Sequence, residues 1–98
     1  MSKLAVESSE LLASQIADYI AQVDQQCRQQ GVRLTPLRRE VLELVLFAKK
    51  PIGAYDLLAQ LGRDGRPAAP PTVYRSLDFL IEQGFIHRLA SINAYLSC

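Results

Sequence analysis

Three neighbouring side chains, Thr72, Tyr74 and Arg75, have chemistry suited to contact with a nucleic acid. The two hydroxyls can donate hydrogen bonds to phosphate oxygens, and the planar guanidinium of Arg75 can bond O6 and N7 of one guanine. Asp78 and Glu82 follow at helical spacing, so a surface ion pair is the alternative for this arginine. The residue types therefore indicate either a turn that reads DNA or an ordinary solvated helix face.

Tyr55 is a second candidate, at the start of a short predicted helix over residues 54–61. An exposed aromatic ring at this place can pack on a thymine methyl group, and its hydroxyl can bond a base edge. A single tyrosine on a helix surface is also commonly a partly buried packing residue. The sequence leaves both interpretations open.

Besides Cys27, the side chains of transition-metal character are His87 and Cys98. They fall on two predicted strands whose pairing can bring them together, but zinc requires four ligands, or three and a water. From the residues alone, an exposed histidine and a cysteine at the tail are favoured over a metal site. Cys27 continues an apolar helical stripe, which favours a packing role.

Apolar residues at helical spacing predict four helices, and two short extended runs near the end predict a hairpin. The predicted helices cover residues 8–29, 36–48, 54–61 and 71–83, and the strands cover 85–90 and 94–98. Residues 51–53 are expected to form a plain turn. We therefore predict a mainly α fold with a small β-hairpin, a winged helix-turn-helix, whose fourth helix would enter the major groove of a duplex.

Turn and cap residues define the ends of these helices. Gly31 is a natural residue after the first helix, and Thr35 with Pro36 predicts the N-cap and first position of the second. Pro71 is expected to open the fourth helix, where exposed N–H groups would attract phosphate, and Gly84 is expected to end it.

Composition and charge fit one small globular domain. The 98 residues are 49% apolar and 21% charged. Residues 1–26 hold one lysine against four acids, residues 27–98 hold ten Lys and Arg against six acids, and residues 27–39 hold four arginines and no acid. This asymmetry suits a basic face that meets phosphate, though a solvated face without a partner has the same composition.

Several classes of protein are not indicated. There is no nucleophile beside a base, no glycine-rich phosphate loop and no carboxylate pair around a histidine, so an enzyme is not expected. No signal sequence or membrane-spanning run is visible, so a cytoplasmic location is expected.

Four longer runs resemble the ferric uptake regulator family. They are Arg-Leu-Thr-Pro at 33–36, Ala-Tyr-Asp-Leu-Leu at 54–58, Pro-Pro-Thr-Val-Tyr-Arg-Ser-Leu-Asp-Phe-Leu at 70–80 and Glu-Gln-Gly-Phe-Ile-His at 82–87. The second and third are similar to the zinc uptake regulator branch of that family. The resemblance covers residues 30–98 and is specific, because a run with Thr-Val-Tyr-Arg opening a helix is not expected by chance.

The resemblance implies a dimeric repressor that, when loaded with zinc, binds AT-rich palindromic operators of zinc-uptake genes. It implies base contacts from Tyr55 and Arg75. The DNA-backbone contacts it implies are Arg33, Thr35, Arg38, Thr72 and Tyr74. His87 and Cys98 match two ligands of a regulatory zinc site at the hinge between domains.

We expect a departure from the family, in that the C-terminal dimerisation and metal-binding domain would be absent. We therefore expect residues 1–98 to form the winged-helix DNA-binding domain alone. Its parts would be an N-terminal helix over 1–30, a helix-turn-helix core over 31–84 and a wing hairpin over 85–98. We also expect a monomer without bound zinc, because half of the ligand set is missing.

Two alternatives remain. One is a relative within the family that responds to iron, manganese or peroxide. The other is a winged helix used for contact with a protein, which would show an exposed apolar patch on the fourth helix. Phe79 is the only hint of such a patch.

Overall fold

The computed structural model describes residues 2–62 and 68–97, and for residues 2–10 it describes the backbone only. The chain divides into two compact units, residues 1–34 and residues 35–98. No helix in the described part of the chain has both the length and the apolar character needed to span a bilayer.

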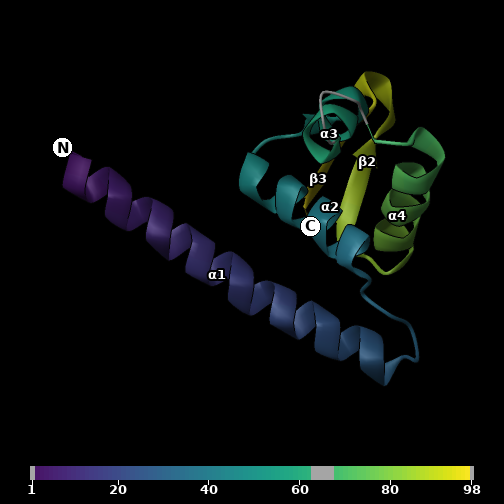
Figure 1. Cartoon of the computed structure of the whole chain (residues 1–98), viewed down its shortest axis with the longest axis horizontal. Coiled ribbons are helices and arrows are strands. Elements are labelled where there is room, and N and C mark those ends of the chain that lie inside the picture. The colour runs from purple at the N-terminus through teal and green to yellow at the C-terminus, as the bar shows by residue number, and fades with distance from the viewer. Residues whose placement is uncertain (1, 63–67, 98) are drawn as a thin grey trace. The chain divides into compact units, whose positions relative to one another are not determined.

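The first unit is one long helix, α1 (Ser2–Gln29), followed by a short turn (Figure 1). The helix begins six residues before the predicted start at Ser8, because residues 2–7 contain neither glycine nor proline. Gly31 has φ of 75°, the Gly31 N–H donates to Arg28 O, and the Val32 N–H donates to Cys27 O. These two bonds make a Schellman motif with glycine in the left-handed position, as predicted.

The expected packing role of Cys27 is supported by its burial together with its stripe. Ile16, Ile20, Val23 and Cys27 lie at helical spacing, and each is at most 7% exposed.

The second unit holds the rest of the secondary structure. Its elements are α2 (Pro36–Ala48), β1 (Ile52–Gly53), α3 (Ala54–Leu61), α4 (Pro70–Glu82), β2 (Ile86–Leu89), the short 3-10 helix η1 (Ala90–Ile92) and β3 (Ala94–Ser97). The predictions for α2 and α3 are confirmed. The prediction that Pro71 opens the fourth helix was wrong by one residue, since Pro70 takes the first position.

The ends of α2 are set by local chemistry. Thr35 Oγ1 accepts a hydrogen bond from the Arg38 N–H at 3.3 Å, the bond of a threonine N-cap. At the other end Lys49 is the C-cap, with φ of 59°. A lysine in the left-handed region is strained, because its Cβ crowds the backbone there.

The wing is a three-stranded sheet with the order β1-β3-β2, and both pairings are antiparallel. The predicted hairpin is present as β2 and β3, but the expectation that 51–53 is only a turn was wrong. Ile52 pairs with Tyr95, and Gly53 pairs with Ala94. The two extended residues before α3 therefore form a third strand, β1, which pairs with β3 of the hairpin.

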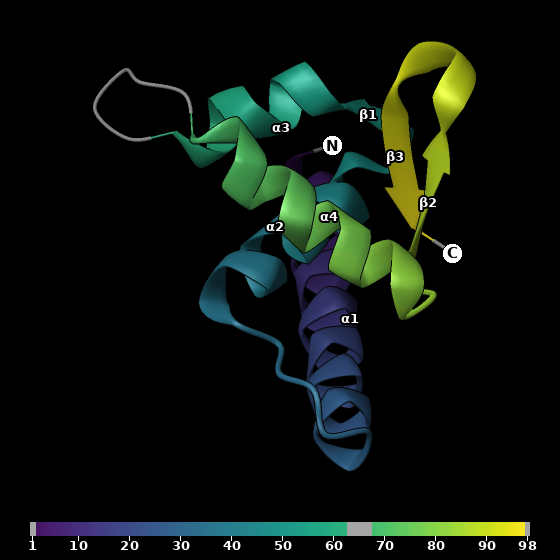
Figure 2. The same ribbon diagram turned by 90° about the vertical axis from the view of Figure 1, so that its right-hand side faces the viewer.

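The core of the second unit lies where α2, α3, α4 and the sheet meet. Its most deeply buried side chains include Leu42, Leu57, Leu77, Leu80 and Ile86. Figure 2 shows α3 above α4, with the hairpin of β2 and β3 on the right, starting near the C-terminal end of α4. This packing holds α4 by one side and leaves its other side at the surface.

Candidate nucleic-acid interface

The start of α4 presents the three side chains that the sequence singled out. Val73 and Leu77 are 1% exposed and hold the helix to the core. The side chains of Thr72, Tyr74 and Arg75 are exposed, with 37% of Tyr74 accessible to solvent. The first turns of α4 therefore carry two hydroxyls and one guanidinium on the solvent side.

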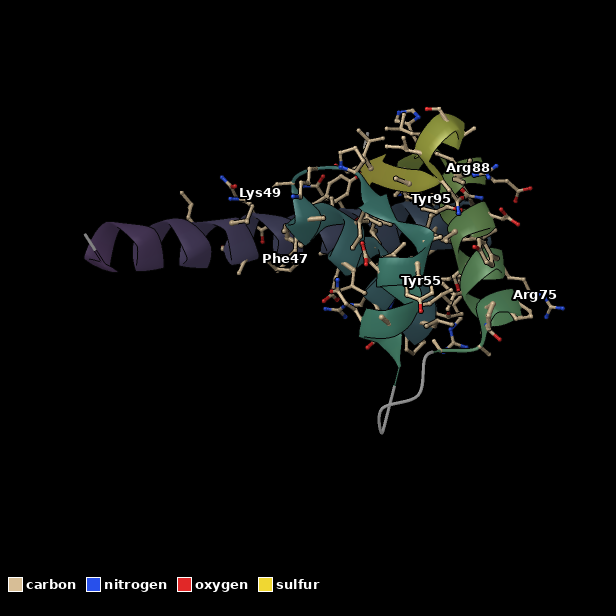
Figure 3. The ribbon with its side chains drawn as sticks, turned by 90° about the horizontal axis from the view of Figure 1, so that it is seen from above. Phe47, Lys49, Tyr55, Arg75, Arg88 and Tyr95 are labelled. Atoms are coloured by element: carbon tan, nitrogen blue, oxygen red, sulfur yellow. The ribbon has the colours of Figure 1, made fainter. Side chains whose placement is uncertain are left out.

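Arg75 extends into solvent. Within residues 2–62 and 68–97, no ion pair joins it to Asp78 or Glu82, so the salt-bridge alternative is not supported. Figure 3 shows its guanidinium pointing away from the body of the second unit. Its side chain is thus placed to reach an external acceptor.

Tyr55 is the second residue of α3 and is 83% exposed, the largest exposure among the large hydrophobic side chains described. Its neighbours Ala54 and Leu57 are buried and anchor the helix. In Figure 3 Tyr55 and Arg75 lie on the part of the surface that α3 and α4 form. The alternative of a partly buried packing tyrosine is therefore wrong.

Few backbone N–H groups are available at the start of α4. Pro70 and Pro71 fill its first two positions, and proline has no N–H. Ala69, the N-cap, has no side-chain hydrogen bond to the helix. Backbone attraction for phosphate is thus weaker than the sequence suggested, and contact with an anion at this end depends mainly on the side chains of Thr72, Tyr74 and Arg75.

The other residues expected at the DNA backbone lie before and within α2. Arg33 is exposed in the first unit, whereas Thr35 and Arg38 belong to the second. The Thr35 hydroxyl oxygen accepts the capping bond, so this residue has a structural role whatever else it contacts. Arg38 lies over the ring of Phe79, with Cζ 3.8 Å from the ring centroid.

Phe79 is not the exposed apolar residue that a protein-binding helix would show. It is 8% exposed, and the guanidinium of Arg38 covers its ring. The only sequence hint of an apolar patch on α4 is thereby removed. The polar face of this helix favours a charged partner.

The described residues do not fit a zinc site. His87 lies on β2, exposed and opposite Leu96, while Cys98 lies outside the described residues. In the described part of the chain there is no group of three or more His, Cys, Asp or Glu side chains that could hold an ion. Zinc needs at least three protein ligands, so these residues cannot hold it in a stable site by themselves.

The wing holds a polar cluster that the sequence did not single out. Arg88 on β2 pairs with Tyr95 on β3, and its Nη2 donates to Asn93 Oδ1 at 3.4 Å. Tyr95 is buried, and this burial raises the pKa of its hydroxyl above 10.0. The positive charge of Arg88 and a hydrogen bond between the two side chains lower this pKa, but by less than burial raises it. The cross-strand register could have revealed this pair, since Arg88 and Tyr95 follow from pairing around residues 90–93.

The order of elements and the exposed start of α4 define a winged helix-turn-helix, so the predicted fold class is confirmed. The ferric uptake regulator family model matches residues 29–94, and the chain belongs to that family. This is a family of regulators, and the chain is not an enzyme.

Curated relatives point to one branch of the family. The zinc uptake regulation proteins of Escherichia coli (strain K12) and Shigella flexneri are each 51% identical to the chain over 81 residues, which is 83% of this chain and 47% of theirs. The chain spans about half the length of these relatives.

Solved structures agree with this similarity. A zinc uptake regulator complexed with zinc and DNA is 49% identical, with a TM-score of 0.77, over 85% of this chain and 55% of that one. Holo XcZur is 46% identical, with a TM-score of 0.73, over 83% of this chain and 55% of that one. The resemblance to the zinc uptake regulator branch is thereby confirmed.

Proposed function

We propose that the chain binds double-stranded DNA as the sequence-reading part of a repressor that responds to zinc and controls zinc-uptake genes. The observation that carries this proposal is the start of α4, where Thr72, Tyr74 and Arg75 are exposed on a helix that the core holds by its opposite side. A relative that is 49% identical has been solved with zinc and DNA, which supports the same activity here.

In the proposed complex α4 lies in the major groove. Arg75 bonds O6 and N7 of a guanine, and Tyr55 meets a base edge or a thymine methyl group. These contacts give sequence preference. The proposed contacts to the DNA backbone are Arg33, Thr35, Arg38, Thr72 and Tyr74, which give affinity for any duplex.

The proposed domain is a single winged-helix module over residues 1–98. It comprises the N-terminal helix (1–30), the helix-turn-helix core (31–84) and the wing (85–98). Two copies on a palindromic, AT-rich operator would place two α4 helices about one helical turn apart. We place this activity in the cytoplasm, where the regulator meets its DNA.

The zinc response is proposed for the whole regulator from the names of its relatives. His87 and Cys98 would supply two zinc ligands, and other residues of the whole regulator would supply the remaining ones. The same names favour zinc over iron, manganese or peroxide as the signal.

Fluorescence anisotropy with a labelled AT-rich palindromic duplex tests the proposal. Binding is expected to weaken steeply with salt, by about 0.9 log units per log unit of salt for each phosphate contacted. A scrambled duplex of equal length and composition is the control for specificity. Absence of binding at low salt, or equal affinity for both duplexes, would contradict the proposed function.

A further inference from the structure

The contact between Arg38 and Phe79 joins two helices of the helix-turn-helix unit. Arg38 lies in the first turn of α2, and Phe79 lies in the second half of α4. The Cζ atom of the arginine is 3.8 Å from the centroid of the ring, so the guanidinium carbon lies over the ring face at van der Waals distance.

Phe79 does not lie on the apolar stripe that anchors α4. That stripe is Val73, Leu77 and Leu80, each at most 1% exposed. Phe79 is nevertheless only 8% exposed, and Arg38 from α2 lies over its ring. The ring thus serves as a surface on which a cation rests.

The position of Arg38 on its own helix is electrostatically unfavourable. The N-terminal end of a helix carries a partial positive charge, which repels a cation, and the first turn of α2 contains no acid. The Arg38 backbone N–H is engaged by Thr35, which also fixes this turn.

We propose that Phe79 is a positioning residue, which holds the guanidinium of Arg38 in the orientation that grips a phosphate of the duplex. This inference rests on the proposed function. A guanidinium that rests on a ring uses its face for that contact, and its five N–H donors lie in its plane, not toward the ring. Because Phe79 already holds the Arg38 side chain in place, binding to phosphate costs less side-chain entropy, and the affinity for the duplex is higher.

The variant Phe79→Leu removes the ring face and keeps an apolar side chain. Phe85→Leu is the matched control, since Phe85 is 6% exposed and no cation lies over its ring within the described residues. Phe79→Tyr keeps the ring and serves as the conservative rescue. Thermal unfolding of each variant shows that it folds before its DNA binding is measured.

The probe is a mixed-sequence duplex of about 30 base pairs, or about three helical turns, because a phosphate contact does not depend on sequence. Phe79→Leu is expected to weaken binding about twofold to fivefold, the range of a cation–π contact at a protein surface. Phe85→Leu and Phe79→Tyr are expected to bind as the unaltered chain does. In an Arg38→Ala background, Phe79→Leu is expected to have no further effect.

Several outcomes would overturn the inference. Equal affinity for Phe79→Leu and Phe85→Leu would do so, as would an undiminished effect of Phe79→Leu in the Arg38→Ala background. If Phe79→Leu does not fold, Arg38→Lys is the variant that tests the inference. Lysine keeps the positive charge but lacks the planar guanidinium and its fork of N–H donors. Lysine is expected to bind more tightly than alanine, because it keeps the attraction to phosphate, but more weakly than arginine. Binding equal to arginine would refute the role of an oriented guanidinium. An unaltered chain that binds no duplex would overturn the proposed function as well.

Discussion

The proposed preference for particular DNA sequences depends most on Arg75. It is exposed on α4, has no ion pair with the acids one turn along, and lies at the start of a helix that is buried on its other side. Residue type and spacing were enough to select it from the sequence. Spacing alone could not exclude its pairing with Asp78 or Glu82, because side-chain conformation decides that.

Arg75→Ala is expected to cost about 1–3 kcal/mol of binding free energy on an operator duplex and to relax preference at one base pair. The control is Arg28→Ala, which removes a surface arginine paired with Asp24. Competition titrations with duplexes that differ at single base pairs measure the effect. Equal losses on operator and random duplex would mean that Arg75 contacts only phosphate.

The hydroxyl of Tyr95 is expected to make the stability of the fold depend on pH. Because burial raises its pKa above 10.0, the folded state favours the neutral phenol more than the unfolded state does. Its contribution to stability is therefore complete below that value and is lost as the pH rises through the raised pKa. Urea unfolding between about pH 8 and pH 11 should show a smaller alkaline loss in Tyr95→Phe than in the unaltered chain. An identical pH profile in the two proteins would refute this assignment.

At the scale of elements, the sequence predicted most where signals are local. The bounds of α2 and α3 follow from Thr35 with Pro36 and from Pro51 and Gly53, which interrupt the helical pattern between the two helices. The strand β1 was missed because its two residues pair with Ala94 and Tyr95, some forty positions along the chain. The burial of Phe79 was missed for a similar reason, since the side chain that covers it belongs to another helix.

The C-cap of α2 permits a prediction about stability. Lys49 has φ of 59°, where glycine avoids the clash of Cβ with the backbone, so Lys49→Gly is expected to stabilise the fold by about 0.5–1 kcal/mol. Lys50→Gly is the matched control, because Lys50 has no positive φ. That variant is expected to be neutral or destabilising. The midpoint of urea unfolding, at an unchanged m-value, measures the stability of both variants. A lower midpoint for Lys49→Gly than for the unaltered chain would contradict this prediction.

At the scale of the whole molecule, two compact units carry the proposed contacts. The second unit contains the winged helix with Tyr55 and Arg75, and the first contains α1 and Arg33. Family membership was predictable from sequence because the long run at 70–80 is specific. The ligand set for zinc was not, since two residues of the right type do not define a coordination sphere.

A preparation of these 98 residues is expected to bind an operator weakly and without regard to zinc. One copy reads one half-site, and linkage of two copies commonly contributes about 10²–10⁴ in affinity. In the described part of the chain no cluster of ligands supplies a metal switch. Anisotropy titrations with added zinc sulfate and with a chelator should therefore coincide. Tight binding that appears only with zinc would contradict this expectation.

The two prolines at the start of α4 have a consequence for evolution. With Pro70 and Pro71 in place, the backbone of that turn offers few hydrogen-bond donors. Most of the proposed recognition in that turn therefore depends on side chains, each of which a mutation in a single codon can alter. A regulator built in this way can acquire a new target sequence by point mutation while its scaffold stays the same.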